Sequence, residues 1–191
     1  MKDEFLSAMH LPEQHWDCTL DQISPELSYV STIQDYVANI GENLDNGRGL
    51  LLFGPHSSGK SGVAAIVLKA ALVKTQQVGL WIRGSHVAGH KIEEDLYDAD
   101  TTMYERCLEV GLLVIDELIL RGTSKAENFV EELIRERVDT RGSMILTTNL
   151  TPAQVKDTHP GIAEVLVEAV EPVKIKGTNF RNKIKDGWSG P

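Results

Sequence analysis

The stretch FGPHSSGKSG, from Phe53 to Gly62, matches the pattern G-x-x-x-x-G-K-[ST] at Gly54, Gly59, Lys60 and Ser61. Glycines let the backbone curl so that successive N–H groups point at phosphate oxygens. The N-terminus of the following helix adds its partial positive charge. The lysine of such a loop reaches the β- and γ-phosphates, and the next hydroxyl binds Mg²⁺. We therefore predict that the whole loop binds ATP or ADP, with these residues: Gly54, Pro55, His56, Ser57, Ser58, Gly59, Lys60, Ser61 and Gly62. His56 is expected to be solvated and is assigned no role of its own.

The sequence on either side of this loop supports a phosphate-binding role. Leu50 to Phe53 form a short apolar run bounded by turn residues, which indicates a strand buried on both faces. Residues 63–73, VAAIVLKAALV, are apolar nearly all round and predict a buried helix. A strand before the loop and a helix after it are the context that the phosphate-binding mechanism requires, and an ordinary Gly/Ser turn does not need them.

A magnesium site also needs a carboxylate, and the stretch GLLVIDE supplies one at the end of a third predicted strand, residues 111–116. Asp116 is expected to hold the Mg²⁺ together with Ser61. Glu117 follows directly and is placed to orient and deprotonate an attacking water. A water-activating base favours a hydrolase over a small-molecule kinase, which transfers phosphate without one.

The stretch SMILTTN, residues 143–149, places polar residues at the tip of a further predicted strand. Asn149 is the candidate that senses the γ-phosphate, with Thr148 second. The order of phosphate loop, Asp-Glu strand and polar-tipped strand is that of ATPases with an extra strand between the first two.

The remaining pattern alternates strands with helices, which predicts a parallel sheet covered on both faces. The expected helices are 24–40, begun by Ser24-Pro25 and ended by Gly41, then 129–138 and 162–170; the other expected strands are 78–82 and an edge strand at 173–176. We predict an α/β phosphate-loop NTPase, a three-layer sandwich around a five-stranded parallel sheet with a minimal or absent lid. Its expected divisions are an irregular lead-in at 1–22, an ATPase core at 23–182 and a flexible tail at 183–191.

Composition narrows the possible functions further. The chain has 191 residues and a net charge of −9, which argues against a protein that grips nucleic acid with its whole surface. A local basic cluster lies near the C-terminus: Lys174, Lys176, Arg181, Lys183 and Lys185. No apolar stretch is long enough to span a membrane or to serve as a signal peptide, so we expect a cytoplasmic protein that does not bind membranes. Two cysteines, Cys18 and Cys107, form no metal-ligand pattern and are expected to be reduced.

Taken together, these motifs resemble the DnaC/IstB-like branch of the AAA+ ATPases, which contains replicative helicase loaders and transposition helper proteins. The resemblance implies a fold of the ASCE/AAA+ kind. The resemblance runs from about Met9 to Arg181. Besides the two motifs above, it is carried by LPEQHWDCTLDQI at 11–23, FVEELIRERVDTRGSMILTTNL at 129–150 and VKIKGTNFR at 173–181. It implies that the lead-in packs near the adenine site, that Asn149 occupies the first sensor position, and that Arg181 is a second sensor that contacts the nucleotide.

One departure from the family concerns the arginine that acts on a neighbouring subunit's ATP. Family members usually carry it in the helix before the closing strand, but GIAEVLVEAVEP at 161–172 has none. Either Arg135, Arg137 or Arg141 substitutes, or a partner supplies the arginine, or the protein is a slow ATPase used as a switch. The region after the second strand is acidic, so the C-terminal basic cluster is the better candidate for weak contact with single-stranded DNA.

The resemblance implies, as the leading hypothesis, an ATP- and Mg²⁺-dependent protein that loads or remodels a DnaB-like hexameric replicative helicase, and that can also oligomerise with itself. A transposition helper ATPase is the second hypothesis, and the acidic balance counts against its strong duplex binding. A slow, nucleotide-switched helicase adaptor or inhibitor is the third.

Overall fold

The computed structural model describes residues 2–87, 102–118 and 125–176. Its five strands form one parallel sheet in the order β2-β3-β4-β1-β5. The strands are β1 (Gly49–Phe53), β2 (Leu80–Arg83), β3 (Leu112–Asp116), β4 (Ser143–Thr148) and β5 (Val170–Lys174). Because β4 lies between β1 and β3, the predicted insertion of a strand between the phosphate-loop strand and the Asp-Glu strand is confirmed.

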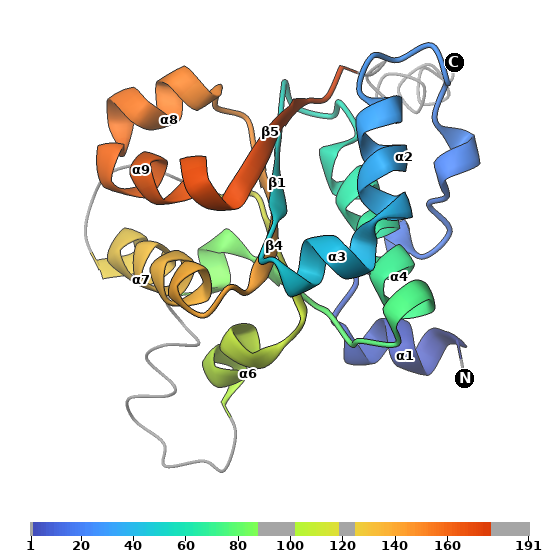
Figure 1. Cartoon of the computed structure of the whole chain (residues 1–191), viewed down its shortest axis with the longest axis horizontal. Coiled ribbons are helices and arrows are strands. Elements are labelled where there is room, and N and C mark those ends of the chain that lie inside the picture. The colour runs from blue at the N-terminus through green and yellow to red at the C-terminus, as the bar shows by residue number, and fades with distance from the viewer. Residues whose placement is uncertain (1, 88–101, 119–124, 177–191) are drawn as a thin grey trace, which may run out of the picture.

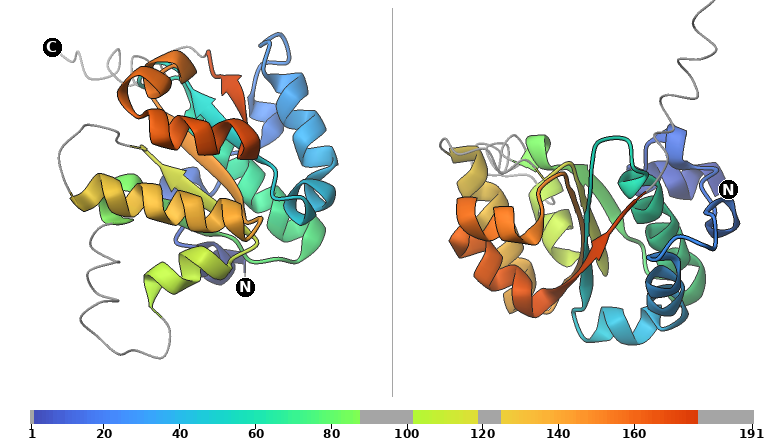
Figure 2. Two further views of the ribbon diagram at one scale, coloured as in Figure 1. Left: turned by 60° about the vertical axis from the view of Figure 1, so that its left-hand side comes forward. Right: turned by 90° about the horizontal axis from the view of Figure 1, so that it is seen from above.

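Helices cover both faces of this sheet and make three layers (Figure 1). One face carries α1 (Lys2–Ala8), α2 (Val30–Ala38), α3 (Ile40–Asp45) and α4 (Lys60–Thr75); the other carries α6 (Met103–Glu109), α7 (Lys125–Asp139), α8 (Pro152–Thr158) and α9 (Pro160–Ala169). The view from above in Figure 2 shows the same separation of the two helical layers by the sheet. The predicted three-layer α/β sandwich is therefore the observed fold.

Two apolar cores result from the alternation of side chains along each strand. Leu50 and Leu52 pack with α2, α3 and α4, while Leu51 packs with the opposite helices. Strands β3 and β4 are buried at every position, as a parallel sheet covered on both faces requires. The carboxyl ends of the central strands therefore meet at one edge of the sheet, where the predicted functional residues lie.

The lead-in is more regular than the sequence indicates. Residues 2–8 form α1, and short 3₁₀ turns follow at Glu13–His15 and Leu20–Gln22. The backbone N–H of Trp81 on edge strand β2 donates to Met9 O at 2.8 Å. Met9 and Leu11 are buried in the core beside α4. The lead-in is thus packed on the core, and the tertiary contacts that order it have no local signal in the sequence.

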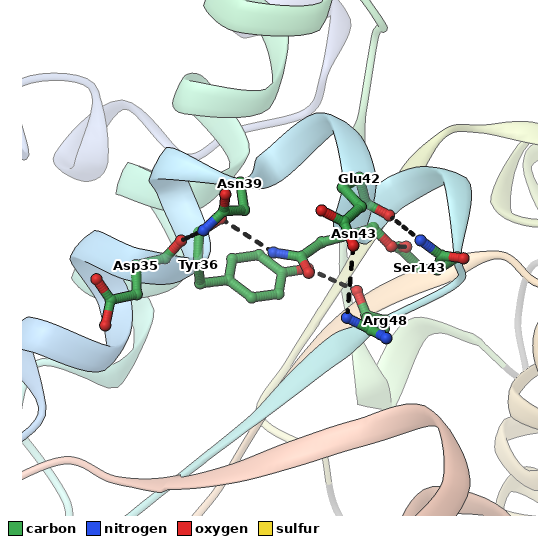
Figure 3. Close-up of polar contacts among 8 residues, drawn as sticks. Asp35, Tyr36, Asn39, Glu42, Asn43, Arg48 and Ser143 are labelled. Carbon is green, nitrogen blue, oxygen red and sulfur yellow. Dashed lines mark hydrogen bonds and ion pairs between the residues drawn. The ribbon is translucent and has the colours of Figure 1, made fainter.

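The first long helix was predicted wrongly at both ends. Residues 24–29 form turns, and α2 begins only at Val30; Gly41 lies inside α3 instead of ending a helix. The break falls at Asn39, where the amide of Asn43 donates to Tyr36 O at 3.1 Å and the hydroxyl of Tyr36 donates to Arg48 O at 2.7 Å (Figure 3). These bonds hold the α2–α3 corner against the start of β1.

Two further differences concern the C-terminal half. The sequence analysis missed α8, which is begun by a capping box at Thr151 and Gln154 with proline in its first turn. Strand β5 lies at the predicted sheet edge but spans Val170–Lys174, a few residues before the expected position. The expected tail at 183–191 lies outside the described residues.

Candidate nucleotide-binding site

The phosphate loop connects β1 to α4 at the carboxyl edge of the sheet, and glycines make its path possible. Gly54 has φ 153° and Gly59, which precedes α4, has φ 98°. A side chain at Gly54 would collide with the backbone oxygen of Ile175 on the segment after β5. The loop therefore curls closely around the start of α4 with backbone conformations that other residues rarely adopt. This cradle fits a phosphate chain.

Lys60 begins α4, and its ammonium group is satisfied by three oxygens. Nζ donates to Gly54 O at 3.0 Å, to Pro55 O at 2.8 Å and to Asn149 Oδ1 at 2.8 Å. Burial lowers the pKa of Lys60, while the negative charges of Asp116 and Glu117 oppose that shift. The structure thus brings the predicted lysine and the predicted sensor into direct contact although they lie in different elements.

Ser61 and Asp116 also meet. The Ser61 hydroxyl on the first turn of α4 donates to Asp116 Oδ1 at the end of β3, at 2.8 Å. A hydroxyl beside a carboxylate, both oxygen ligands, suits Mg²⁺, which protein sites of this kind hold with few protein ligands plus water and phosphates. Within residues 2–87, 102–118 and 125–176, no cluster of three or more His, Cys, Asp or Glu competes as a metal site.

The second acidic residue differs from the first in its surroundings. Asp116 is only 6% exposed, whereas Glu117 is exposed to solvent. Glu117 has φ 55°, a left-handed conformation that is uncommon outside glycine and is often associated with function. A side chain would also be excluded at Gly84, after β2, because it would lie 2.8 Å from Glu117 O. The turn after β3 is therefore closely fitted, and it leaves the Glu117 side chain accessible.

Asn149 follows β4 and has a second neighbour in the phosphate loop. Its amide Nδ2 lies 3.3 Å from His56 Nδ1, so the exposed His56 ring contacts the predicted sensor. Thr148, the second sensor candidate, is buried, and its hydroxyl bonds two main-chain groups, Leu118 O and Leu150 N. The geometry therefore favours Asn149 over Thr148.

Sequence reasoning missed Thr147. Its hydroxyl donates to Asp116 Oδ1 at 2.7 Å and accepts from the Glu117 backbone N–H at 2.9 Å. A signal was present, because a threonine within a fully buried strand must place its hydroxyl on a partner. The partner itself depends on strand order, since β4 could have paired elsewhere.

The lead-in is fastened beside this site by Lys69 of α4. Its ammonium group donates to the carbonyl oxygens of His15 at 3.3 Å and Trp16 at 2.7 Å, and also to that of Cys18. The Cys18 sulfur lies beside Gly62 on the first turn of α4. Burial lowers the pKa of His15, and Lys69 adds to that effect while Asp116 opposes it. The lead-in therefore adjoins the phosphate loop, near the start of α4.

The three arginines offered as substitutes for the missing one are not equivalent. Arg137 is fully buried, and its guanidinium donates to four carbonyls, of Cys107, Leu108, Val110 and Ser143. It caps the end of α6 and cannot reach a neighbouring molecule. Arg135 is exposed and pairs with Glu131 at 2.7 Å, and Arg141 is exposed after α7. Arg181 lies outside the described residues.

Replacing Arg137 with methionine should lower the free energy of unfolding by about 3 kcal/mol, because it leaves several buried carbonyls without a donor. ATP affinity should stay within about two-fold, since none of its partners belongs to the phosphate loop. Urea unfolding and nucleotide titration measure both, with the exposed Arg141→Met as the matched control. An unchanged stability would contradict the assigned role.

Comparison with known proteins agrees with this fold. The family model described as IstB-like ATP binding protein matches residues 35–186, so the chain belongs to that family. Its fold is that of the AAA+ ATPases, as predicted, and the family binds ATP. No curated protein matches the chain significantly.

Solved structures give the same fold. The DnaC helicase loader matches with TM-score 0.76 and 24% identity, over 86% of this chain and all of that one. A putative primosome component from Streptococcus pyogenes serotype M3 matches with TM-score 0.70 and 17% identity, over 94% of this chain and 99% of that one. AMPPCP-bound DnaA from Aquifex aeolicus matches with TM-score 0.67 and 14% identity, over 93% of this chain and 55% of that one. Among the described helices, none is long and apolar enough to cross a membrane.

Proposed function

We propose that the protein binds and hydrolyses ATP and uses the nucleotide state to load or remodel a hexameric replicative DNA helicase. The observation that carries the proposal is the convergence of four residues from three segments, the start of α4 and the ends of β3 and β4, on one edge of the sheet. Lys60 contacts Asn149, and Ser61 contacts Asp116, each through a bond of 2.8 Å. These are the groups needed to bind a triphosphate, hold Mg²⁺ and detect the γ-phosphate.

In this proposal each residue has one task. The loop N–H groups and Lys60 bind the phosphates, and Ser61 and Asp116 hold Mg²⁺, which neutralises phosphate charge. Glu117, accessible beside this pair, accepts the proton of the attacking water. Asn149 gives up its bond to Lys60 and turns its amide toward the γ-phosphate. Arg181 adds a contact to the nucleotide from the segment after β5.

ATP then acts mainly by favouring one of two conformations, because a ligand shifts an equilibrium only by its different affinity for the two states. The contact between Lys60 and Asn149 belongs to the state without a γ-phosphate, and both residues gain a new partner when ATP binds. Since Arg137 is buried and α9 has no arginine, we propose that the arginine that completes the site is the exposed Arg135 or Arg141 of another copy of the chain, or one from the helicase.

The helicase is proposed as partner because the motifs resemble helicase loaders and because the DnaC helicase loader shares the fold along its whole length. A DnaB-like hexamer is the expected form of the helicase, and the C-terminal basic cluster is the expected place for weak contact with single-stranded DNA. Membership of the IstB-like family favours a transposition helper ATPase as the second candidate. The lack of arginine in α9 favours a slow, nucleotide-switched adaptor as the third.

Co-purification with the replicative helicase of the same source tests the proposal. We expect a complex whose yield differs between ATP, ADP and no nucleotide, and expect Lys60→Ala to abolish that difference. Absence of a complex in every nucleotide state would contradict the loader function. Strong, salt-sensitive binding to duplex DNA in the same preparations would instead support the transposition helper.

A further inference from the structure

Thr147 links the two acidic residues at the end of β3. It lies on the neighbouring strand β4, where Ile115 pairs with Leu146, so the next residue of β4 comes level with Asp116. Its side chain is only 1% exposed. A hydroxyl has one proton and two lone pairs. Here the proton goes to Asp116 Oδ1 at 2.7 Å, and a lone pair accepts the Glu117 N–H at 2.9 Å.

These two bonds act on the two acidic residues in different ways. Asp116 Oδ1 accepts from both Thr147 and Ser61, so the Thr147 bond fixes which way the carboxylate faces. For Glu117 the bond is to the backbone. Together with the bond from the Leu118 N–H to Thr147 O at 2.8 Å, it holds the turn in which Glu117 has φ 55°. That turn separates the buried Asp116 from the exposed Glu117 side chain.

We propose that Thr147 is a positioning residue for ATP hydrolysis, which fixes the Asp116 carboxylate toward Ser61 and holds the Glu117 backbone in its left-handed turn. The inference rests on the proposed ATPase function. Because Thr147 is buried, it is proposed to act through these two residues and not by contact with the nucleotide. The hydroxyl of the adjacent Thr148 instead bonds Leu118 O and Leu150 N, and within the described residues it makes no bond to Asp116 or Glu117. Of the two threonines at the end of β4, it is therefore Thr147 whose hydroxyl contacts Asp116 and the Glu117 backbone.

Thr147→Val tests the inference, because valine keeps the shape and removes the hydroxyl, while Thr147→Ser keeps the hydroxyl. In Thr147→Val we expect kcat to fall about 10- to 100-fold with ATP affinity changed less than about three-fold, as misplaced catalytic groups reduce rate more than binding. The Mg²⁺ concentration needed for tight nucleotide binding should rise. In nucleotide-free protein, the Glu117 amide should exchange its hydrogen faster by NMR. Thr147→Ser should restore all of these.

Ser143→Ala is the matched control, since it removes a buried hydroxyl at the other end of the same strand, where Ser143 donates to Asn43 O at 3.1 Å. It should lower the melting temperature without changing Mg²⁺ dependence or Glu117 exchange. The inference is overturned if Thr147→Val keeps native turnover and native Glu117 exchange, or if it only mirrors the stability loss of Ser143→Ala. If the native protein hydrolyses no ATP, the proposed function fails, while amide exchange and Mg²⁺-dependent binding still decide the role of Thr147.

Discussion

Replacing Lys60 with alanine should weaken ATP binding by about 100-fold, because two or more charge-assisted hydrogen bonds to phosphate oxygens are lost together. In the structure the ammonium group of Lys60 already contacts two carbonyl oxygens of the phosphate loop, Gly54 O and Pro55 O, and Asn149 Oδ1. Titration with a fluorescent ATP analogue measures the change.

Lys74→Ala is the control for Lys60→Ala, because Lys74 is an exposed lysine in the last turn of the same helix and donates to Val37 O, away from the phosphate loop. Its ATP affinity should match that of the native protein. An affinity of Lys60→Ala within about three-fold of the native value would contradict the phosphate-binding role, since charge-assisted bonds of this kind cannot be lost without a larger cost.

Replacing Glu117 with glutamine should reduce ATP turnover by about 10²- to 10⁴-fold, the usual contribution of a general base. Glutamine keeps the size of the side chain and cannot take a proton from water. ATP binding should stay intact because the phosphates are held by the loop and Lys60, so the protein should accumulate in its ATP-bound state. Phosphate release and nucleotide titration on the same preparation separate the two effects.

The exposed Glu132→Gln on α7 provides a matched change of charge elsewhere on the surface, and it should leave turnover unchanged. Normal hydrolysis in Glu117→Gln would refute the assignment of the base. A loss of ATP binding equal to the loss of turnover would likewise count against it, because a base that acts only on water contributes little to ground-state binding.

The parts of the fold that follow from local pattern were predictable. Leu50–Phe53, the loop and α4 form a continuous motif in which each element requires the next, and the order of the later strands then places β4 beside β1. Lys60, Ser61, Asp116 and Asn149 converge because parallel strands end at one edge of the sheet, so their meeting followed from the topology.

Other features depend on contacts between distant segments and could not be predicted from pattern alone. The packing of the lead-in depends on Lys69 and on the edge of β2, far along the chain. Arg137 is buried because its guanidinium binds carbonyls at the end of α6. An arginine in an amphipathic helix would be expected on the exposed face, so the sequence does not predict this burial. The contact between Thr147 and Asp116 depends on the register of β3 and β4, which the sequence does not give.

A structure of the protein with Mg²⁺ and a non-hydrolysable ATP analogue would show directly whether these residues form the ATP site. We predict that Lys60 and Asn149 exchange their mutual bond for contacts with the phosphate chain, that Ser61 and Asp116 lie at the Mg²⁺, and that Glu117 faces the γ-phosphate. A nucleotide bound elsewhere, or one bound in the loop with the Lys60–Asn149 bond intact and Glu117 turned away, would contradict it.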